Sequence, residues 1–291
     1  MLSVKVLVTG GEGQVAHALG AKIPAGLDLA LLGRRELDLN DSQSICTVLD
    51  AVQPAVVINA AAYTAVDRAE AEPDAALRVN GLAVRALAEA CASRHIRLIH
   101  ISTDFVFDGQ KSSPYEPDDA PNPLSVYGAT KLEGEKYVRA QGGLEYLIVR
   151  TAWVYSQTGR NFLTMMLRLF SERSVVQVVA DQIGTPTSAH SLAECLWHAA
   201  TDAGPSGTLH FTDAGVASWY DFAQAIYEEG RERGLVKREV EIRPIRTDEY
   251  PTPARRPAFS VLDKSTSLER LSLQPIHWRL RLKEVLSGLS K

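Results

Sequence analysis

The chain has 291 residues, a formal net charge of −4 and a pI near 6.0. This length suits one large domain or two interlocked ones, and a mildly acidic chain with scattered Lys and Arg gives no electrostatic footprint for nucleic acid. No apolar run approaches the roughly 20 residues that a membrane helix needs, and the N-terminus lacks the pattern of a signal peptide. We therefore expect a soluble, cytoplasmic protein that binds neither nucleic acid nor membrane.

Strand-like and helix-like segments alternate through the first two-thirds of the chain. The expected strands, short and apolar, cover residues 4–8, 27–32, 54–60, 97–102 and 146–151. The expected helices cover residues 14–23, 42–52, 73–93 and 124–141. Continuous apolar strands separated by helices predict a parallel sheet covered on both faces, which is the doubly wound α/β class of the Rossmann type.

The pattern is less regular beyond Thr151. The elements expected there are strands at 175–179 and 208–211, helices at 191–200 and 219–231, and a loop at 247–257. Both strands are expected to join the same sheet. We therefore predict an NAD(P)-binding Rossmann domain over residues 1–155, to which strands return from about 175–213. Residues 156–291 then form a smaller α/β part that mainly binds the substrate.

A glycine-rich turn lies directly after the first strand. Gly10, Gly13 and Ala16 fit the pattern G-x-x-G-x-x-G/A, and Gln14 and Val15 open the next helix. Such a turn brings the backbone close to a pyrophosphate, and the helix N-terminus offers free N–H groups and partial positive charge. Glycines also make ordinary turns, but a strand before and a helix after favour a dinucleotide site.

The end of the second strand bears on the choice between NADH and NADPH. Arg34 and Arg35 lie there, and guanidinium groups pair well with a 2′-phosphate. They favour NADPH, although they can also be solvated surface residues, and NADH use stays open. Asp38 and Leu39 form an acidic and apolar pair of the kind that lies against adenine.

Small residues follow the third strand. Ala61 and Ala62 would let a cofactor lie against the backbone, or they simply allow close packing. Tyr63 comes next, and Ile101 lies near the end of the fourth strand. We include all four in the predicted cofactor site.

Tyr127 and Lys131 lie four residues apart in an expected helix, and hence on one face, one turn apart. A free phenol has a pKa of about 10, and a neighbouring ammonium lowers it, so the pair can exchange a proton with a substrate oxygen. Thr103 follows the fourth strand, at the edge where open parallel sheets bind ligands. Its hydroxyl can orient the substrate oxygen or cap a turn.

The glycine loop, Thr103 and the Tyr-x-x-x-Lys pair occur in the order that resembles the extended short-chain dehydrogenase/reductase superfamily. Further segments resemble the dTDP-4-dehydrorhamnose reductase family over nearly the whole chain. They cover residues 13–15, 59–67, 102–109, 150–155, 181–187 and 256–263. The resemblance implies NADPH-dependent or NADH-dependent reduction of a 4-keto sugar on a nucleotide carrier, dTDP-4-dehydro-L-rhamnose to dTDP-L-rhamnose.

The resemblance also implies residue roles. Tyr127 protonates the developing oxyanion, Lys131 lowers the Tyr127 pKa and holds the nicotinamide ribose, and Thr103 orients the carbonyl. The implied substrate contacts are Thr64, Thr103, Asp104, Trp153, Asn161 and Arg256. Arg256 would bind the diphosphate, because an arginine fork matches phosphate. Trp153 can equally be a core residue, and Arg256 a solvated loop residue.

The family pattern is not complete in this chain. Some members dimerise around a metal held by acidic residues, and Ala18 occupies the place of one of them. We therefore predict no metal and leave a homodimer possible. His190, Glu194 and His198 share one helix face and could bind a metal, but a solvated face explains them as well.

Two other functions stay open. A nucleotide-sugar dehydratase of this superfamily carries an acidic pair after the threonine, and here Asp104 is followed by Phe105. An epimerase would keep its cofactor and show no net oxidation. A non-catalytic regulatory subunit of methionine adenosyltransferase shares this fold and much of this motif set, although Tyr127 and Lys131 favour catalysis.

Overall fold

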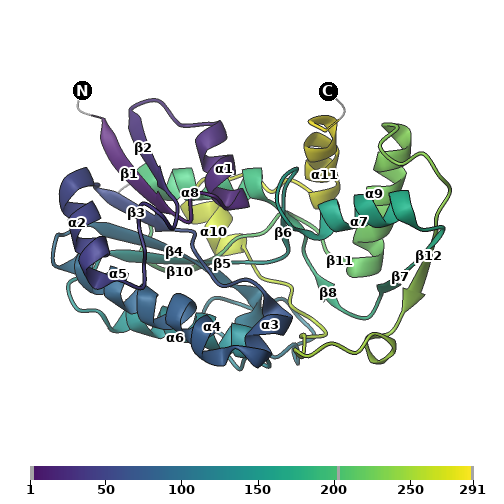
Figure 1. The fold of residues 1–291 in the computed structure, drawn as a ribbon, viewed down its shortest axis with the longest axis horizontal. Helices are drawn as coiled ribbons and strands as arrows, with labels where there is room; N and C mark the ends of the chain where they lie inside the picture. The colour runs from purple at the N-terminus through teal and green to yellow at the C-terminus, as the bar shows by residue number, and fades with distance from the viewer. Residues whose placement is uncertain (1–2, 202–203, 290–291) are drawn as a thin grey trace.

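The computed structural model describes residues 3–201 and 204–289, and its centre is a six-stranded parallel sheet (Figure 1). The strand order is β10-β5-β4-β3-β1-β2. The strands are β1 Val4–Thr9, β2 Leu27–Leu32, β3 Val56–Asn59, β4 Arg97–Thr103, β5 Tyr146–Thr151 and β10 Gly207–His210. The chain moves from β1 to one edge and then returns through β3 toward the other, so the order reverses between β1 and β3. This confirms the predicted Rossmann-type class and puts the ligand-binding crevice at that reversal.

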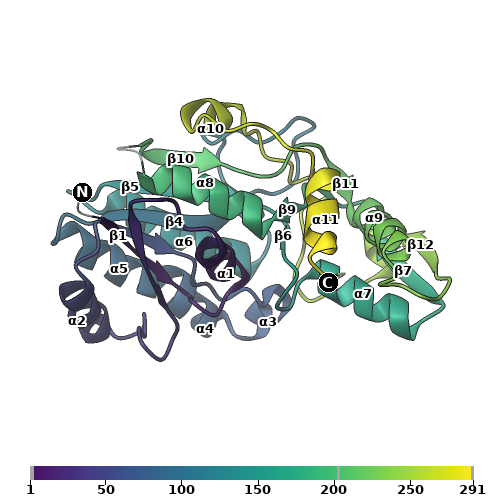
Figure 2. The same cartoon turned by 90° about the horizontal axis from the view of Figure 1, so that it is seen from above.

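Helices cover both faces of this sheet (Figure 2). One face packs against α1 Gln14–Ala21 and α8 Ala189–Thr201, with α10 Ser265–Arg270 nearby. The other face packs against α2 Ser42–Val52, α5 Ala83–Ala92 and α6 Val126–Ala140. The central strands are buried on both sides, which is why they read as continuous apolar runs.

The segment before α5 is helical but not uniform. It contains α3 Val66–Ala71, α4 Pro73–Leu77 and a π-helical turn, η1 Arg78–Leu82. The predicted helix at 73–93 therefore has the right extent, with one wide turn inside it. Such turns often occur at functional sites, and this one carries the fully buried Asn80.

The prediction for residues 175–179 was right about the strand and wrong about the sheet to which it belongs. A strand does form there, β7 Val175–Val179, but it pairs with β12 Glu241–Ile245 in a separate two-stranded sheet. Exposure alternates along β7, with Val176 and Val178 buried and their neighbours open to solvent. A strand with one apolar face suits a two-stranded ribbon on a second core better than a sheet covered on both sides.

The second core lies beside the central sheet and is formed by residues after β5 (Figure 1). Its helices are α7 Phe162–Glu172, α9 Trp219–Glu232 and α11 Trp278–Ser287. Two short strand pairs lie between the two cores: β6 Val154–Tyr155 with β9 Thr187–Ser188, and β8 Ile183–Gly184 with β11 Ala217–Ser218. Short 3-10 turns occur at η2 Asp104–Val106 and η3 Thr247–Glu249. Within the described residues, no helix is both long and apolar enough to cross a membrane.

Candidate active site

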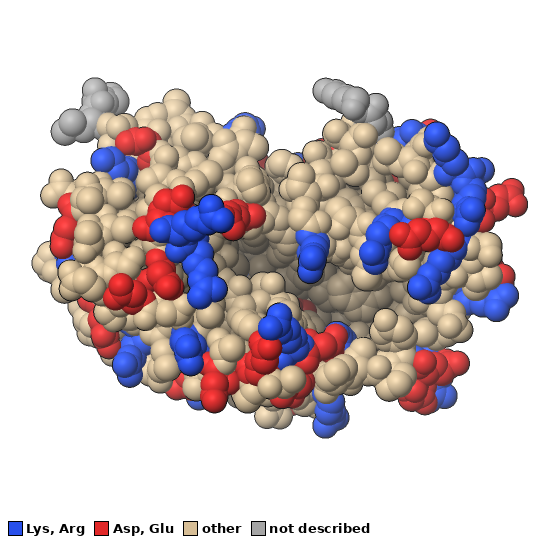
Figure 3. Space-filling view, viewed as in Figure 1, with Lys and Arg blue, Asp and Glu red and all other residues tan. Residues whose placement is uncertain are grey.

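A cleft of about 900 Å³ lies between the two cores, and Figure 3 shows it as a hollow with Lys and Arg side chains around its opening. Its walls come from the carboxyl ends of the central strands and from segments of the second core. Of the described residues that the sequence singled out for the site, all except Arg35 line this cleft. Their roles remain predictions, but one cavity brings them together.

The glycine loop after β1 packs closely against the loop that follows β3. Gly10 has φ +68°, and a Cβ there would lie 2.9 Å from the Ala61 backbone, so a side chain fits poorly in this turn. Gly13 precedes α1, and no side chain among the described residues caps that helix end. The first backbone N–H groups of α1 are therefore available to bind an anion in the cleft.

The side chain of Gln14 also joins the two cores. Its side-chain amide donates to the Val154 carbonyl at 3.0 Å, and its Oε1 accepts from Ser156 and Asn161 at 3.2 and 3.3 Å. The start of α1 is thus tied to the second core. Asn161 has a further structural role, because its Oδ1 accepts from the Thr164 N–H and caps α7.

The turn after β2 presents one of its two arginines to the cleft. Arg34 lines the cleft and is exposed, while Arg35 is exposed and is not among the described residues that line the cleft. Asp38 accepts from the Asn40 N–H at 3.0 Å and from its side-chain amide at 2.9 Å, and these hydrogen bonds lower the Asp38 pKa. The acidic side chain is therefore fixed beside Arg34 and stays ionised.

The start of α6 brings Tyr127 close to the end of β4. Ser125 caps the helix by accepting from the Gly128 N–H at 3.2 Å. A Cβ on Gly128 would overlap the Phe105 carbonyl oxygen, so glycine here permits the helix to lie directly against η2. The rings of Phe105 and Tyr127 meet edge to face at 5.8 Å. Thr103 and Tyr127 consequently face the same part of the cleft.

The ionisation of Tyr127 differs from the sequence prediction. Burial raises its pKa to about 12, and the charge of Asp104 adds to this, while a hydrogen bond with Thr103 opposes it. Burial also lowers the pKa of Lys131 to about 8. The predicted lowering of the tyrosine pKa is therefore wrong for the chain as it stands. Desolvation sets the direction of the shift, and Tyr127 is a phenol at neutral pH.

Lys131 and Thr103 each make contacts that fix their position. The Lys131 Nζ donates to the Ile101 carbonyl at 2.7 Å and lies 3.4 Å from Nε2 of His100. The Thr103 hydroxyl donates to Asp104 at 3.0 Å and accepts from the Phe105 N–H at 3.2 Å. Thr103 therefore caps a turn and also lines the cleft. Capping the turn and contacting the substrate, the two roles that the sequence suggested, are thus compatible.

Asp104 is a buried carboxyl group beside Thr103, with 2% of its surface exposed. Burial raises its pKa to about 6, while hydrogen bonds from Ser260 and Thr103 hold it down. It thus keeps a negative charge at neutral pH next to the position expected for the substrate oxygen.

Asn80 fixes one wall of the cleft from the π-helical turn. Its Oδ1 accepts from the Tyr63 N–H at 2.9 Å, and its Nδ2 donates to the Tyr63 carbonyl at 3.1 Å and to Thr130 at 3.2 Å. One side chain therefore joins the loop after β3 to α6. This positions Tyr63, whose hydroxyl in turn donates to Glu72 at 2.8 Å.

The far wall of the cleft is aromatic. Trp153 has φ +48° and stacks on Trp219 with ring centroids 3.5 Å apart and planes 4° apart. A left-handed conformation at a bulky residue is uncommon and marks strained or functional positions. Both tryptophans line the cleft. Trp153 therefore forms part of the cleft wall, which was one of the two roles that the sequence suggested for it.

Arg256 reaches the cleft from the long loop after η3, but it already has an acidic partner. Its guanidinium donates to both carboxylate oxygens of Asp67, at 3.0 and 2.8 Å, and it also contacts Thr252 and the Ala254 carbonyl. This bidentate pair joins α3 to the C-terminal loop. A diphosphate would therefore meet an arginine that is positioned but shared with a carboxylate.

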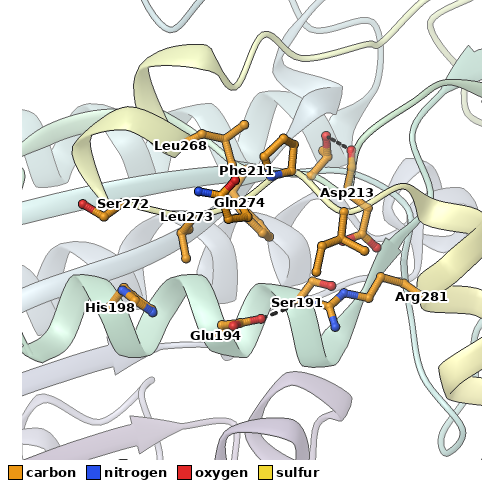
Figure 4. A pocket seen from close by; sticks show the side chains of 13 residues that line it. Ser191, Glu194, His198, Phe211, Asp213, Leu268, Ser272, Leu273, Gln274 and Arg281 are labelled. Carbon is orange, nitrogen blue, oxygen red and sulfur yellow. Dashed lines mark hydrogen bonds and ion pairs between the residues drawn. The ribbon is translucent and has the colours of Figure 1, made fainter.

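The helix face with His190, Glu194 and His198 forms no metal centre in the described part of the chain, where no group of three or more His, Cys, Asp or Glu could hold an ion. Glu194 pairs with Arg281 at 3.0 Å. Glu194 and His198 line a second cavity of about 160 Å³, between α8, α10 and α11 (Figure 4). Leu192, on the same helix, lines the large cleft instead.

Arg160 and Trp219 are among the cleft residues that the sequence reasoning missed. Arg160 lies on the exposed loop between β6 and α7, and Trp219 opens α9. A basic residue one position before the predicted Asn161 was a usable signal for Arg160. Trp219 gave none, because its place depends on stacking against Trp153 across the fold.

The fold and this cleft define a class of protein: a Rossmann-type oxidoreductase of the short-chain dehydrogenase/reductase kind. The family model described as RmlD substrate binding domain matches residues 4–290. A curated relative, the dTDP-4-dehydrorhamnose reductase of Burkholderia thailandensis, is 44% identical over 286 residues, which are 95% of this chain and 96% of the relative. The chain therefore belongs to the RmlD substrate-binding-domain family.

Solved structures agree with this assignment. A dTDP-4-dehydrorhamnose reductase from Clostridium acetobutylicum superposes with a TM-score of 0.92 at 37% identity, covering 99% of this chain and 100% of that one. The dTDP-4-dehydrorhamnose reductase from Bacillus anthracis, in complex with NADP, superposes with a TM-score of 0.90 at 32% identity, covering 98% and 99%. The similarity thus extends over both cores.

Proposed function

We propose that this chain catalyses the NAD(P)H-dependent reduction of dTDP-4-dehydro-L-rhamnose to dTDP-L-rhamnose. The names of relatives that match it over nearly their whole length support this activity. The observation that carries the proposal is that Tyr127, Lys131 and Thr103 line the same cleft as the glycine loop. A phenol, an amine and a hydroxyl beside a dinucleotide site are the groups that carbonyl reduction needs.

The residues present fit a nicotinamide dinucleotide. The uncapped N–H groups in the first turn of α1 suit its pyrophosphate, and Arg34 suits a 2′-phosphate. Gly10, Gly13 and Ala61 line the cleft with little or no side chain, which lets a cofactor lie against the backbone. When bound, the reduced cofactor supplies a hydride for C4 of the sugar. The NADP of the Bacillus anthracis structure supports NADPH as the cofactor.

The chain's own residues supply the proton. The raised pKa keeps Tyr127 protonated at neutral pH, so its hydroxyl can donate to the oxygen that gains charge as the carbonyl is reduced. Lys131, with a pKa of about 8, is mostly an ammonium at neutral pH and stabilises the phenolate left behind. The Thr103 hydroxyl, which donates to Asp104 in the free chain, would turn its single hydrogen to the same oxygen and orient it.

The second core and the loops around it would bind the nucleotide-sugar part of the substrate. The flat Trp153 and Trp219 pair offers an apolar wall for the sugar or base. Thr64, Asn161 and Arg256 provide polar groups along the rest of the cleft. We therefore keep the division into a cofactor part, residues 1–155, and a mainly substrate-binding part, residues 156–291. A homodimer stays a prediction from the sequence.

The proposal is tested by supplying the purified chain with dTDP-4-dehydro-L-rhamnose and NADPH or NADH. Consumption of one NADPH per sugar reduced supports it. Turnover of a nucleotide sugar without net loss of NADPH would instead indicate an epimerase. Co-purification with a methionine adenosyltransferase, together with no reductase activity, would indicate a regulatory subunit.

Replacing Arg34 with alanine is expected to raise the KM for NADPH and to leave the KM for NADH nearly unchanged. Hydrogen bonds between charged groups contribute about 1.5–3 kcal/mol, so an increase of roughly tenfold or more is expected. Steady-state kinetics with both cofactors measure it. Arg35→Ala is the matched control, because this neighbour does not line the cleft among the described residues. Equal effects of the two variants would contradict the role of Arg34.

Replacing Arg256 with alanine is expected to raise the KM for the nucleotide sugar by about tenfold and to leave the KM for NADPH unchanged. The loss of the charged fork removes the group expected to bind the diphosphate. The neighbouring Arg255 is exposed and lies outside the described lining of the cleft, so Arg255→Ala should behave as the wild type. A changed KM for NADPH alone would assign Arg256 to the cofactor.

A further inference from the structure

A line of buried polar side chains leads away from Lys131 into the central sheet. It runs from His100 on β4 through Asn59 on β3 to Thr9 on β1. His100 and Asn59 are 0% and 1% exposed, and neither is among the described residues that line the cleft. The proposed mechanism uses none of these three, and buried polar groups of this kind need hydrogen-bond partners.

The two ends of the Asn59 amide can be told apart. The Thr9 hydroxyl lies 2.7 Å from Oδ1, the usual length of an O–H···O hydrogen bond. The Ala61 N–H also points at this atom, at 3.3 Å, and only an oxygen can accept from both donors. The amide NH₂ group must therefore face His100, where Nδ2 lies 3.1 Å from Nδ1 of the ring.

This arrangement selects one form of the imidazole. Because Nδ1 of His100 accepts a hydrogen bond from the Asn59 amide, the single N–H of the neutral ring lies on Nε2. That N–H points at Nζ of Lys131, 3.4 Å away. The separation exceeds the usual 2.7–3.2 Å, as expected when both groups carry hydrogens. The ammonium instead directs a hydrogen to the Ile101 carbonyl at 2.7 Å.

The surrounding charges keep this ring neutral. Burial, followed by the charges of Lys131 and Arg139, lowers the pKa of His100 well below its usual value. The negative charge of Glu135, one turn beyond Lys131 on α6, raises the pKa of Lys131 and favours the ammonium. Arg150 on β5 and Arg139 both pair with Glu135 and weaken that influence.

We propose that Asn59 holds His100 as the Nε2–H tautomer and that this N–H, aimed at Lys131, makes His100 a positioning residue that sets how readily the ammonium loses its proton. The Nε2–H favours the neutral amine, which can accept it, and disfavours the ammonium, which cannot. The kinetic consequence rests on the proposed function. The tautomer itself does not.

The tautomer is tested by ¹⁵N NMR of the whole chain labelled at histidine, with His100→Asn used to assign the ring signals. The neutral Nε2–H form is expected throughout pH 6–9, with no titration. A signal of the Nδ1–H form, or a ring that becomes charged in this range, would overturn the proposal. This measurement needs no substrate, so its result stands even if the proposed activity fails.

Kinetics test the effect on Lys131. Turnover should fall as pH rises through the lysine pKa, because only the ammonium stabilises the phenolate. In His100→Asn the shorter side chain still faces Asn59 but leaves nothing at the Nε2 position. The pH at which kcat falls on the alkaline side (the alkaline limb) is expected to be about one unit higher than in the wild type. At pH 9 the variant should then keep about fivefold more of its plateau rate than the wild type does. An unchanged or lowered limb would contradict the proposal.

A second variant keeps the imidazole and leaves no cavity. In Asn59→Asp the carboxylate accepts from Nδ1–H, which turns Nε2 into an acceptor for the ammonium. The NMR signal should switch to the Nδ1–H form, and the alkaline limb should again move up. A switched tautomer with an unmoved limb would show that His100 has no influence on Lys131.

His210→Asn is the matched control. His210 is an equally buried histidine on β10, where it contacts the Tyr115 carbonyl and Arg150. His210→Asn should lower the free energy of unfolding about as much as His100→Asn does, without shifting the alkaline limb of kcat. A limb that moves as far in His210→Asn as in His100→Asn would mean that any buried histidine has this effect, and the proposal would fail.

Discussion

Tyr127→Phe is expected to lose most of its turnover while still binding NADPH. The variant keeps the ring that contacts Phe105 and loses only the hydroxyl. Removing a positioned general acid typically costs about 10²–10⁴-fold in rate, and that range is expected for kcat. Fluorescence titration with NADPH and steady-state kinetics with the 4-keto sugar measure the two properties separately.

Tyr137→Phe on the same helix provides the comparison. Tyr137 contacts Arg85 and does not line the cleft among the described residues. The same hydroxyl is deleted from the same helix, so effects on helix stability are matched. Turnover close to the wild type is expected. Normal turnover in Tyr127→Phe, or an equal loss in both variants, would remove Tyr127 from the role of proton donor.

The parts of the site that follow from local sequence could be predicted. The glycine loop is set by a strand, a turn and a helix in immediate succession, and the Tyr127 and Lys131 pair by one helical turn. The carboxyl ends of parallel strands meet at one edge of the sheet, which brings Thr103 to the same place. These three features need no knowledge of distant contacts, and all of them line one cleft.

Features that depend on distant partners could not be predicted. The partner of β7 is β12, about 65 residues later, and alternating exposure alone does not name it. Asp67 and Arg256 pair across 189 positions, so the sequence could mark the arginine but not its carboxylate. Trp219 reaches the cleft only because it stacks on Trp153.

The pKa of Tyr127 is a further property of the site that the sequence could not predict. From the spacing alone, a lysine one turn away should lower the tyrosine pKa. The folded chain buries the phenol and turns the Lys131 amine toward Ile101 and His100, so burial decides the direction. Desolvation depends on everything packed around a group, and no local pattern reports it.

Glu135→Ala is expected to lower the free energy of unfolding by about 3–5 kcal/mol, because it leaves a buried guanidinium without its partner. Glu135 and Arg150 are 0% and 1% exposed and pair through two hydrogen bonds of 2.9 and 2.8 Å. The Glu135 carboxylate also accepts from Ser102, the residue before Thr103, and from Arg139. Urea unfolding at neutral pH measures the loss.

An exposed ion pair gives the scale for this effect. Asp248→Ala removes the partner of Arg246 at the surface, where both side chains are largely exposed, and should change the free energy of unfolding by less than about 1 kcal/mol. Glu135→Gln keeps the shape and should fall between the two, because the amide retains hydrogen bonds but no charge. If Glu135→Ala were as mild as Asp248→Ala, water or a rearranged partner would have to solvate Arg150. The Glu135–Arg150 pair could then not be what holds the end of β5 against α6.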